Sequence, residues 1–417
     1  MIFVSGSTQI HRQLTTRPTP SDPLEHVLGA PSPGRPQPGY EKSFMQLTGT
    51  PFLVVTIILV PISIAAALLL WGRVRGPRPV KLLSRTAMIL FCQLTAVTTV
   101  FVMVNNANLI YGSWDDLLGT GDHVRAVPKV PADTGSGSGS DSKTRAKVIQ
   151  SFTGVGDPKV PGDVQNTELK GEVSGVDGEV LVWLPPQYND PAYKDKNFPV
   201  VELLPGWPGS SKTWFGTLKV SDQLKPMMEK GEVAPFILVS PRTNLLGDDV
   251  DTGCADVPGK VNADTWLSRD VPQMVLDNFR ADPSPERWAV AGYSAGGHCA
   301  GKLALEHPNR YRAGVSLSGY SDPGQEPHSL TAKDPVLKEK SNLLNILKNS
   351  QTPPKVALFV SGNKGDGFEA AAALKAAAKA PTTVTTVETT GPHASDVWRP
   401  MVPDVFKWLT GVIPVQH

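Results

Sequence analysis

One serine in this chain stands in a pattern typical of a nucleophile. Ser294 lies between Gly292 and Gly296, after a short apolar run of strand type and before a helix-compatible run at 295–305. A serine squeezed between a strand and a helix has a strained backbone, so glycines are needed where side chains would clash. Its hydroxyl is then exposed, and the amides at the helix start face the oxyanion formed during attack on a carbonyl. We predict Ser294 as the nucleophile and the Ala295 N–H as an oxyanion donor.

A nucleophilic serine needs a base, which follows it along the chain in one common hydrolase order. His393 fits this order, because it follows the β-rich run 382–388 and precedes a helix predicted over 402–409. The other histidines of the region lie on the predicted helix behind the serine or in a polar insertion: His298, His307 and His328. We therefore predict His393 as the base.

The acid that orients the base should follow the strand predicted over 355–361. Asp366 lies in a glycine loop directly after that strand, and a short carboxylate there reaches an imidazole ring without crossing the sheet. Glu369 is the alternative acid. Asp366 has a second interpretation as the N-cap of an alanine-rich helix predicted at 369–379.

A second oxyanion donor is expected in the loop after an earlier strand. The apolar, β-branched run 198–204 leads into Pro205-Gly206-Trp207. A glycine at 206 lets the backbone approach a substrate closely, and the Trp207 N–H would complete the pair of donors. The alternative is a proline–glycine turn that contacts no ligand.

These motifs together resemble the esterase D and antigen 85 branch of the α/β-hydrolases over roughly residues 165–412. The resemblance is carried by Pro-Pro-Gln-Tyr at 185–188, Leu-Leu-Pro-Gly-Trp-Pro-Gly at 203–209, Gly-Tyr-Ser-Ala-Gly-Gly at 292–297, and Gly-Pro-His at 391–393 with Trp398. It implies a doubly wound, mostly parallel sheet and a triad that maps onto Ser294, Asp366 and His393. Members include carboxylesterases and mycolyltransferases. Many carry a histidine or aspartate where this chain has Pro205.

Two long apolar segments precede this region. Residues 52–71 form a nearly unbroken apolar run that contains Pro61, and residues 87–110 carry no charge. At about 1.5 Å per residue, about 20 helical residues cross a hydrocarbon core of about 30 Å, and membrane helices tolerate proline. We predict two transmembrane helices, with a buried hairpin of a soluble protein as the alternative.

Charges around these segments predict their orientation. Five basic side chains lie between or beside the spans: Arg73, Arg75, Arg78, Lys81 and Arg85. Asp115 and Asp116 follow the second span. Basic residues favour the cytoplasmic side of a membrane. The sequence therefore predicts a multi-pass protein of the cell membrane with its hydrolase domain outside the cytoplasm.

Composition divides the chain of 417 residues into four parts. Residues 1–44 are rich in Pro, Gly, Ser and Thr and are predicted to be disordered, so a translation start at Met45 is a hypothesis. Residues 45–115 form the membrane anchor. Residues 116–150 contain a Gly-Ser repeat and are predicted to form a flexible linker. Residues 151–417 are long enough for one α/β domain with its own core.

The balance of charge and motifs excludes several functions. A net charge of +1 gives no broad field that would attract nucleic acid, and basic residues are not interleaved with aromatic ones. We expect no metal, because no Cys, His or carboxylate cluster has ligand spacing, and no cofactor, because phosphate-binding glycine loops are absent from the sequence.

Two cysteines fall in the predicted outer domain, where oxidation is allowed. A disulfide between Cys254 and Cys299 would hold the loop 245–262 against the helix behind Ser294. The alternative is a buried thiol at position 299.

These features predict a membrane-anchored, extracytoplasmic serine hydrolase that acts on carboxylic esters through an acyl-enzyme. Lipid or glycan esters of the cell envelope are the expected substrates, and the acyl group would pass to water or to another alcohol. The alternative is a catalytically silent, hydrolase-like module that binds an envelope component. The combination of Ser294, Asp366 and His393 favours the enzyme, because a silent module has no physical reason to keep all three. The sequence carries no signal for an oligomeric state.

Overall fold

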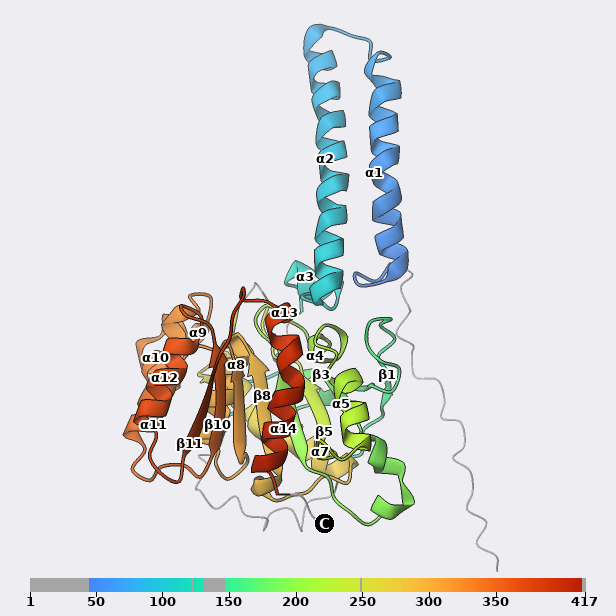
Figure 1. The fold of residues 1–417 in the computed structure, drawn as a ribbon. Coiled ribbons are helices and arrows are strands. Elements are labelled where there is room, and N and C mark those ends of the chain that lie inside the picture. The colour runs from blue at the N-terminus through green and yellow to red at the C-terminus, as the bar shows by residue number, and fades with distance from the viewer. Residues whose placement is uncertain (1–44, 122, 131–146, 248–249, 415–417) are drawn as a thin grey trace, which may run out of the picture. The chain divides into compact units, whose positions relative to one another are not determined.

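The computed structural model describes residues 45–121, 123–130, 147–247 and 250–414 (Figure 1). The predicted N-terminal extension 1–44 and the central part of the predicted linker, 131–146, lie outside the described residues.

Two long apolar helices come first, α1 (Thr50–Trp71) and α2 (Arg78–Asn108). Both are long and apolar enough to cross a membrane by length and composition. They are joined by polar contacts: the Ser63 and Thr95 hydroxyls lie 3.0 Å apart, and the Thr99 hydroxyl donates to the Thr56 carbonyl at 2.9 Å. Most of their large apolar side chains are exposed to the surroundings, which the core hairpin of a soluble protein would not show.

The α2 helix begins nine residues before the apolar run predicted from residue 87. Pro77 is its extended N-cap and a proline occupies its first turn, where a missing N–H costs nothing. The helix thus includes the charged residues Arg78, Lys81 and Arg85. The predicted span of 87–110 did not include them, because it was based on the apolar run alone.

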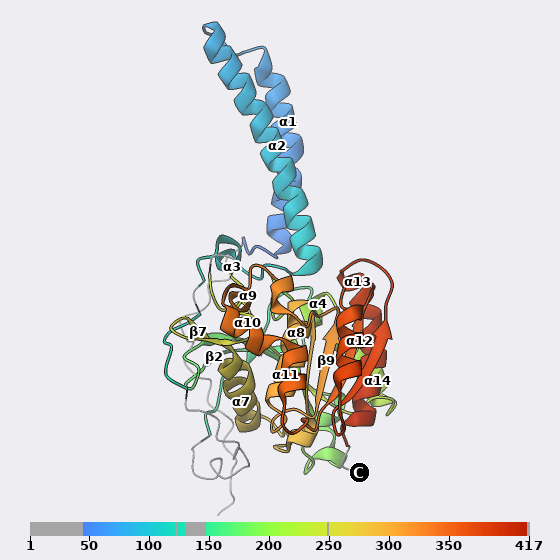
Figure 2. The same cartoon turned by 90° about the vertical axis from the view of Figure 1, so that its left-hand side faces the viewer.

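A nine-stranded sheet forms the centre of the α/β domain (Figures 1 and 2). Its order is β1-β2-β3-β5-β4-β8-β9-β10-β11, antiparallel from β1 to β5 and parallel from β5 to β11. The strands are β1 (Thr153–Gly154), β2 (Gln165–Lys170), β3 (Asp177–Trp183), β4 (Val200–Leu204), β5 (Ile237–Pro241), β8 (Trp288–Tyr293), β9 (Ala313–Leu317), β10 (Ala357–Gly362) and β11 (Thr383–Glu388). A separate small hairpin pairs β6 (Asp256–Val257) with β7 (Val261–Asn262).

Helices cover both faces of the sheet and bury the two sets of side chains of each strand. In β8, Trp288 and Val290 join one core, and Ala289, Ala291 and Tyr293 join the other, as the alternation of a strand requires. The first core packs against α7 (Val271–Asn278), α8 (Ala295–Glu306), α11 (Leu343–Asn349) and α12 (Phe368–Ala377). The second packs against α4 (Thr213–Gly216), α5 (Val220–Glu229) and α14 (Val402–Val412). The remaining short helices are α3 (Trp114–Leu118), α6 (Ala263–Thr265), α9 (Leu330–Lys333), α10 (Pro335–Ser341) and α13 (Ser395–Trp398).

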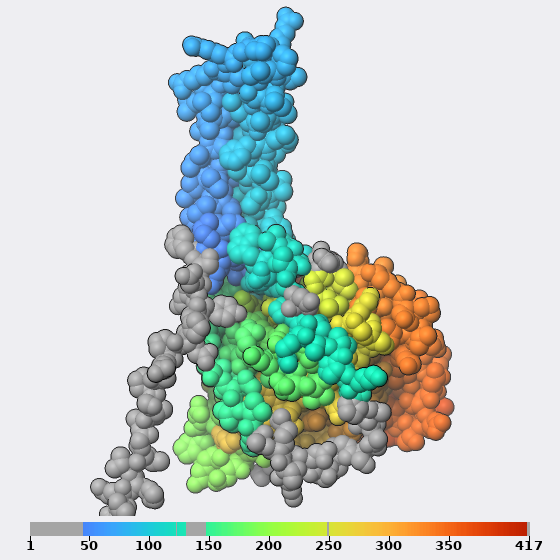
Figure 3. Space-filling model, turned by 180° about the vertical axis from the view of Figure 1, so that it is seen from behind, coloured from blue at the N-terminus to red at the C-terminus, as the bar shows by residue number. Residues whose placement is uncertain are grey.

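The described ends of the predicted linker contact the α/β domain. Val124 forms a β-bridge with Val176, and the Asn262 side-chain amide donates to the Pro128 carbonyl at 3.1 Å. After the undescribed stretch, the Val148 amide donates to Asp277. In Figure 3 the turquoise residues around 114–130 lie on the surface of the domain beside yellow residues near 250.

Candidate active site

Ser294 occupies a sharp turn between β8 and α8. Its φ of 55° and ψ of −127° are rare for a residue with a side chain. A Cβ on Gly292 would lie 1.9 Å from the Gly296 carbonyl oxygen, and one on Gly296 would lie 2.3 Å from the Pro205 oxygen. The glycines on both sides of the serine are therefore required by close approach of backbone to backbone, and the Ser294 amide is fixed by donating to the Leu317 carbonyl at 2.9 Å.

The structure brings Ser294, His393 and Asp366 together in one hydrogen-bonded chain. His393 Nε2 lies 2.8 Å from the Ser294 Oγ, and His393 Nδ1 lies 2.8 Å from the Asp366 Oδ1. With Nδ1 donating to the carboxylate, Nε2 is free to accept the serine proton. This is the geometry that activates a serine for attack on a carbonyl.

Two loops that are fixed to each other position the base and the acid. The backbones of Asn363 and Asp366 exchange two hydrogen bonds, at 3.0 and 2.9 Å, which closes a tight loop after β10. The Asn363 side-chain amide donates to the Gly391 carbonyl at 2.6 Å and joins this loop to the one carrying His393. The His393 ring also stands edge-on to Trp398, with centroids 4.9 Å apart.

Glu369, the alternative acid, has a different contact. Both of its carboxylate oxygens accept from the Gly365 amide, at 3.1 and 3.0 Å, so it braces the loop that carries Asp366. The alternative interpretation of Asp366 as a helix N-cap does not fit, because α12 begins at Phe368 with Gly367 as its N-cap. That leaves the Asp366 carboxylate directed at the imidazole.

The loop after β4 comes directly against the serine. A Cβ on Gly206 would lie 2.9 Å from the Tyr293 ring and 3.0 Å from the Ser294 Cβ, so only glycine allows this approach. A small cavity is lined by residues from both sides of this contact, including Gly206, Trp207 and Ala295. The two residues predicted to donate N–H groups to an oxyanion thus border the same space.

Aromatic side chains surround this contact. Tyr293 stacks on Trp398 with centroids 4.6 Å apart and packs near Trp214. Burial raises the pKa of Tyr293 to about 12, although hydrogen bonds from the Thr213 side chain and the Gly206 backbone oppose the shift. Tyr293 therefore stays neutral and supports the serine turn through packing.

Among the described residues, His298 and His328 contact groups other than Ser294. The His298 ring is fully buried on α8, stacks on Tyr320, and has Nδ1 3.0 Å from the Tyr320 carbonyl oxygen. Burial lowers its pKa to about 4, so it is uncharged at neutral pH. The exposed His328 stacks on Trp207 with centroids 5.4 Å apart. Nothing in the local sequence connects the insertion carrying His328 to Trp207.

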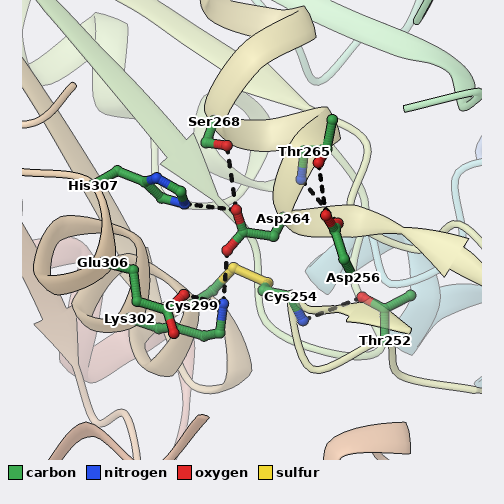
Figure 4. A network of polar contacts seen from close by, with 10 residues as sticks. All are labelled: Thr252, Cys254, Asp256, Asp264, Thr265, Ser268, Cys299, Lys302, Glu306 and His307. Carbon is green, nitrogen blue, oxygen red and sulfur yellow. Dashed lines mark hydrogen bonds and ion pairs between the residues drawn. A yellow bond between two sulfur atoms is a disulfide. The ribbon is translucent and has the colours of Figure 1, made fainter. Parts of the chain in front are cut away.

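Cys254 and Cys299 form a disulfide, with Cα atoms 5.6 Å apart. Cys299 lies on α8, one turn past the serine, and Cys254 lies in the loop that also lines the cavity beside Ala295. The bridge joins this loop to the helix behind Ser294 (Figure 4).

A partly buried ionic network continues along α8 (Figure 4). The Lys302 ammonium lies 2.7 Å from an Asp264 oxygen and 2.5 Å from a Glu306 oxygen, and His307 Nε2 lies 2.6 Å from the other Asp264 oxygen. Burial alone would raise the pKa of Asp264, but the Lys302 charge and the His307 hydrogen bond hold it well below its ordinary value.

The arrangement of Asp264, Glu306 and His307 places three possible metal ligands close together. The Lys302 ammonium already supplies the positive charge between the two carboxylates. The network is therefore best explained as an ion-pair cluster that holds α8 to the segment at α6, and we assign it no metal.

The α/β domain is similar to several known proteins. The Esterase family model matches residues 172–408, more than half of the chain. An uncharacterised protein of Corynebacterium glutamicum is 25% identical over 345 residues, covering 76% of this chain and 75% of that protein. S-formylglutathione hydrolase of Rattus norvegicus is 28% identical over 109 residues, 25% of this chain and 38% of the relative.

Solved structures share the fold. A ferulic acid esterase superposes with a TM-score of 0.52 at 20% identity, covering 60% of this chain and 98% of the other. S-formylglutathione hydrolase from Agrobacterium tumefaciens superposes with a TM-score of 0.51 at 16% identity, covering 64% of this chain and all of the other. At these identities the likeness establishes a common α/β-hydrolase architecture.

Proposed function

Because the chain belongs to the Esterase family, we propose that it is a serine carboxylesterase that works through an acyl-enzyme intermediate. The observation that carries the proposal is the chain of two 2.8 Å contacts from Ser294 through His393 to Asp366. A catalytically silent module would not need this alignment.

The geometry supports a two-step reaction. The Ser294 oxygen attacks the ester carbonyl while its proton passes to His393 Nε2, and the carbonyl oxygen, now negative, accepts from the Trp207 and Ala295 amides. His393 then gives the proton to the leaving alcohol as the carbon–oxygen bond of the ester breaks. Asp366 keeps the proton on Nδ1 and stabilises the imidazolium that forms in between. In the second step His393 takes a proton from water, and the water oxygen attacks the acyl carbon. The bond from that carbon to the Ser294 oxygen then breaks, His393 returns the proton to this oxygen, and the carboxylic acid leaves.

An alcohol in place of water would take the acyl group by the same second step, which is the reaction of an acyltransferase of the mycolyltransferase kind. The two activities share every residue named above and differ in the acceptor. Product analysis with and without added alcohols separates them.

We further propose that α1 and α2 anchor the enzyme in a membrane with the α/β domain outside the cytoplasm. The basic residues between the helices favour a cytoplasmic position for that segment, and the Cys254–Cys299 disulfide suits an oxidising compartment. The substrates would then be lipid or glycan esters of the cell envelope.

The test is to label the purified full chain in detergent with a fluorophosphonate and to assay short and long p-nitrophenyl esters. The wild-type protein should be labelled and active, and Ser294→Ala should be neither. Ser316→Ala is a control, because Ser316 is a buried serine on the neighbouring strand β9. Absence of labelling, with ester hydrolysis unchanged in Ser294→Ala, would contradict the proposal.

A further inference from the structure

The segment that follows α2 lies against the loop that carries Trp207. We call residues 109–116 the docking segment and residues 205–217 the oxyanion loop. We propose that the docking segment is a positioning element of the active site, so that the helical hairpin belongs to the catalytic unit. This inference rests on the proposed esterase function.

Leu109 makes the central contact. Its carbonyl oxygen accepts from the Ser210 hydroxyl at 2.9 Å and from the Thr213 hydroxyl at 3.2 Å. Its side chain is fully buried, and a Cβ on Gly216 would lie 2.2 Å from the Leu109 Cδ1. One residue at the end of α2 therefore holds three positions of the oxyanion loop, two by hydrogen bonds and one by packing.

The conformation of Leu109 shows that this contact is fixed. Leu109 caps α2 with φ 51° and ψ 44°, a left-handed backbone that costs a leucine about 1 kcal/mol. Such residues persist where the surrounding structure determines them. Here the Leu109 amide donates to the Asn105 carbonyl at 2.7 Å, and the Asn105 side chain exchanges two hydrogen bonds with the Tyr111 backbone.

An ion pair holds the other end of the docking segment. Arg242 Nη1, just after β5, lies 2.6 Å from the Asp116 Oδ1, and both side chains are largely buried. Burial alone would raise the pKa of Asp116, but the Arg242 guanidinium keeps it below its ordinary value. Asn244 lies two residues after Arg242, and its side-chain amide donates to the Gly209 carbonyl at 2.8 Å. The docking segment and the β5 loop thus hold the oxyanion loop from two sides.

Thr213 connects these contacts to the serine turn. Its hydroxyl donates to the Leu109 carbonyl, and the next residue, Trp214, packs near the Tyr293 ring with centroids 5.7 Å apart. Gly206 lies against the same ring, since a Cβ there would be 2.9 Å from it. Tyr293 precedes Ser294, and Gly206 precedes Trp207. A shift at Leu109 therefore reaches both the nucleophile turn and the proposed oxyanion donor through Thr213 and the packing around Tyr293.

The chemistry predicts a specific kinetic effect. An oxyanion donor acts mainly where charge develops, in the transition state, so misplacing Trp207 lowers kcat and leaves KM nearly unchanged. The pH dependence of kcat should not move, because His393 and Asp366 do not contact the docking segment in the hydrogen bonds described above.

Two sets of variants of the full chain in detergent test this. Leu109→Ala should lower kcat for p-nitrophenyl butyrate and the rate of fluorophosphonate labelling about tenfold, a fraction of the loss on deleting a whole oxyanion donor. Leu118→Ala is the matched control, since that leucine is 67% exposed, and should behave as wild type. Thr213→Val should resemble Leu109→Ala, and Thr213→Ser, which keeps the hydroxyl, should restore kcat.

The outcomes separate three cases. Wild-type kcat in both Leu109→Ala and Thr213→Val overturns the positioning role. The role is also overturned if Thr213→Val lowers kcat and Thr213→Ser does not restore it. A change in KM and in the pH profile together with kcat overturns it as well. An unlabelled, inactive wild-type protein overturns the proposed esterase function instead, and the inference falls with it. If Leu109→Ala does not fold, the Thr213 pair decides alone.

Discussion

His393 uses both ring nitrogens, one toward the Ser294 oxygen and one toward Asp366. The carboxylate selects the tautomer, and the imidazole can work as a base in no other form. Glu369, three residues from Asp366, instead accepts from a backbone amide. Asp366 and Glu369 therefore make different contacts, and substituting each one alone tests them separately.

Asp366→Asn should lower kcat by about 10³ to 10⁴, because an amide no longer holds the proton on Nδ1. Glu369→Gln keeps an acceptor for the Gly365 amide and should lower kcat less than about tenfold. Steady-state kinetics on one p-nitrophenyl ester compares them. An equal loss in both variants, or a larger one in Glu369→Gln, would reverse the assignment.

The sequence distinguishes these residues unequally. Ser294 is identifiable because the two glycines and the strand–helix setting are local, and the chain order selects His393. Asp366 lies in the loop after β10, and Glu369 lies only three residues farther on, in the first turn of α12. Both follow the same strand, so the sequence did not decide between them. The hydrogen bonds between Asn363 and Asp366 turn the loop and direct one carboxylate to His393.

At the scale of elements, the central strand β4 carries a buried acid. Glu202 is fully buried and accepts from the Tyr311 hydroxyl at 2.8 Å. Burial raises its pKa to about 8. The folded protein thus holds a proton here that the unfolded chain releases above its ordinary pKa of about 4.5. The stabilising contribution is complete below pH 4.5 and is lost progressively as the pH rises to about 8.

Glu202→Gln should remove this dependence, because glutamine has no proton to release. Relative to the variant, the wild-type free energy of unfolding should fall by about 1.4 kcal/mol per pH unit between pH 5 and pH 8. Denaturant titrations of both proteins at several pH values measure the difference. A difference that does not change with pH would mean that Glu202 is ionised in the folded state.

The disulfide joins the loop beside the cavity to α8 across 45 residues. Closing a loop of this length restricts the unfolded chain, and the entropy model gives about 4 kcal/mol. The double variant Cys254→Ser, Cys299→Ser should lower the free energy of unfolding by up to this amount. Cys92→Ser, which removes the free cysteine of α2, is the control. Two reactive thiols in the unreduced α/β domain would contradict the bridge.

Element boundaries were predictable where one physical signal decides them. The strand over 288–292 and the helix over 295–305 agree closely with β8 and α8. The apolar run leads into the glycine-bounded turn at Ser294, and Pro308 prevents the helix from continuing. The start of α2 was not predictable in this way. Hydropathy marks only the apolar stretch, whereas the helix begins nine residues earlier, beside two prolines.

At the scale of the whole molecule, the proposed topology gives a labelling pattern. In a Cys92→Ser background, Lys355→Cys, at an exposed position of the α/β domain, should react with a membrane-impermeant maleimide on intact bacterial cells. Arg75→Cys, between α1 and α2, should react after lysis. Labelling of Arg75→Cys on intact cells, with Lys355→Cys protected, would invert the topology.

Two apolar helices precede the α/β domain, in the order expected from composition. The contacts between the helices and the domain were not predictable. Residues 116–150 read as a tether because of a Gly-Ser repeat, yet Asp116 pairs with Arg242 and Val124 pairs with Val176. The Leu109 carbonyl that binds two hydroxyls is a backbone group, and sequence patterns give no information about which backbone carbonyl meets a distant side chain.

In the proposed mechanism His393 carries the proton, and 43% of its side chain is accessible to solvent. Water can therefore reach a serine-bound acyl group without a gate having to open. An alcohol acceptor would have to be bound so that it reacts with the acyl group faster than water does, because transfer to an alcohol depends on excluding water. If the proposed acyl-enzyme forms, the exposure of His393 favours its hydrolysis to a free carboxylic acid over transfer to an alcohol.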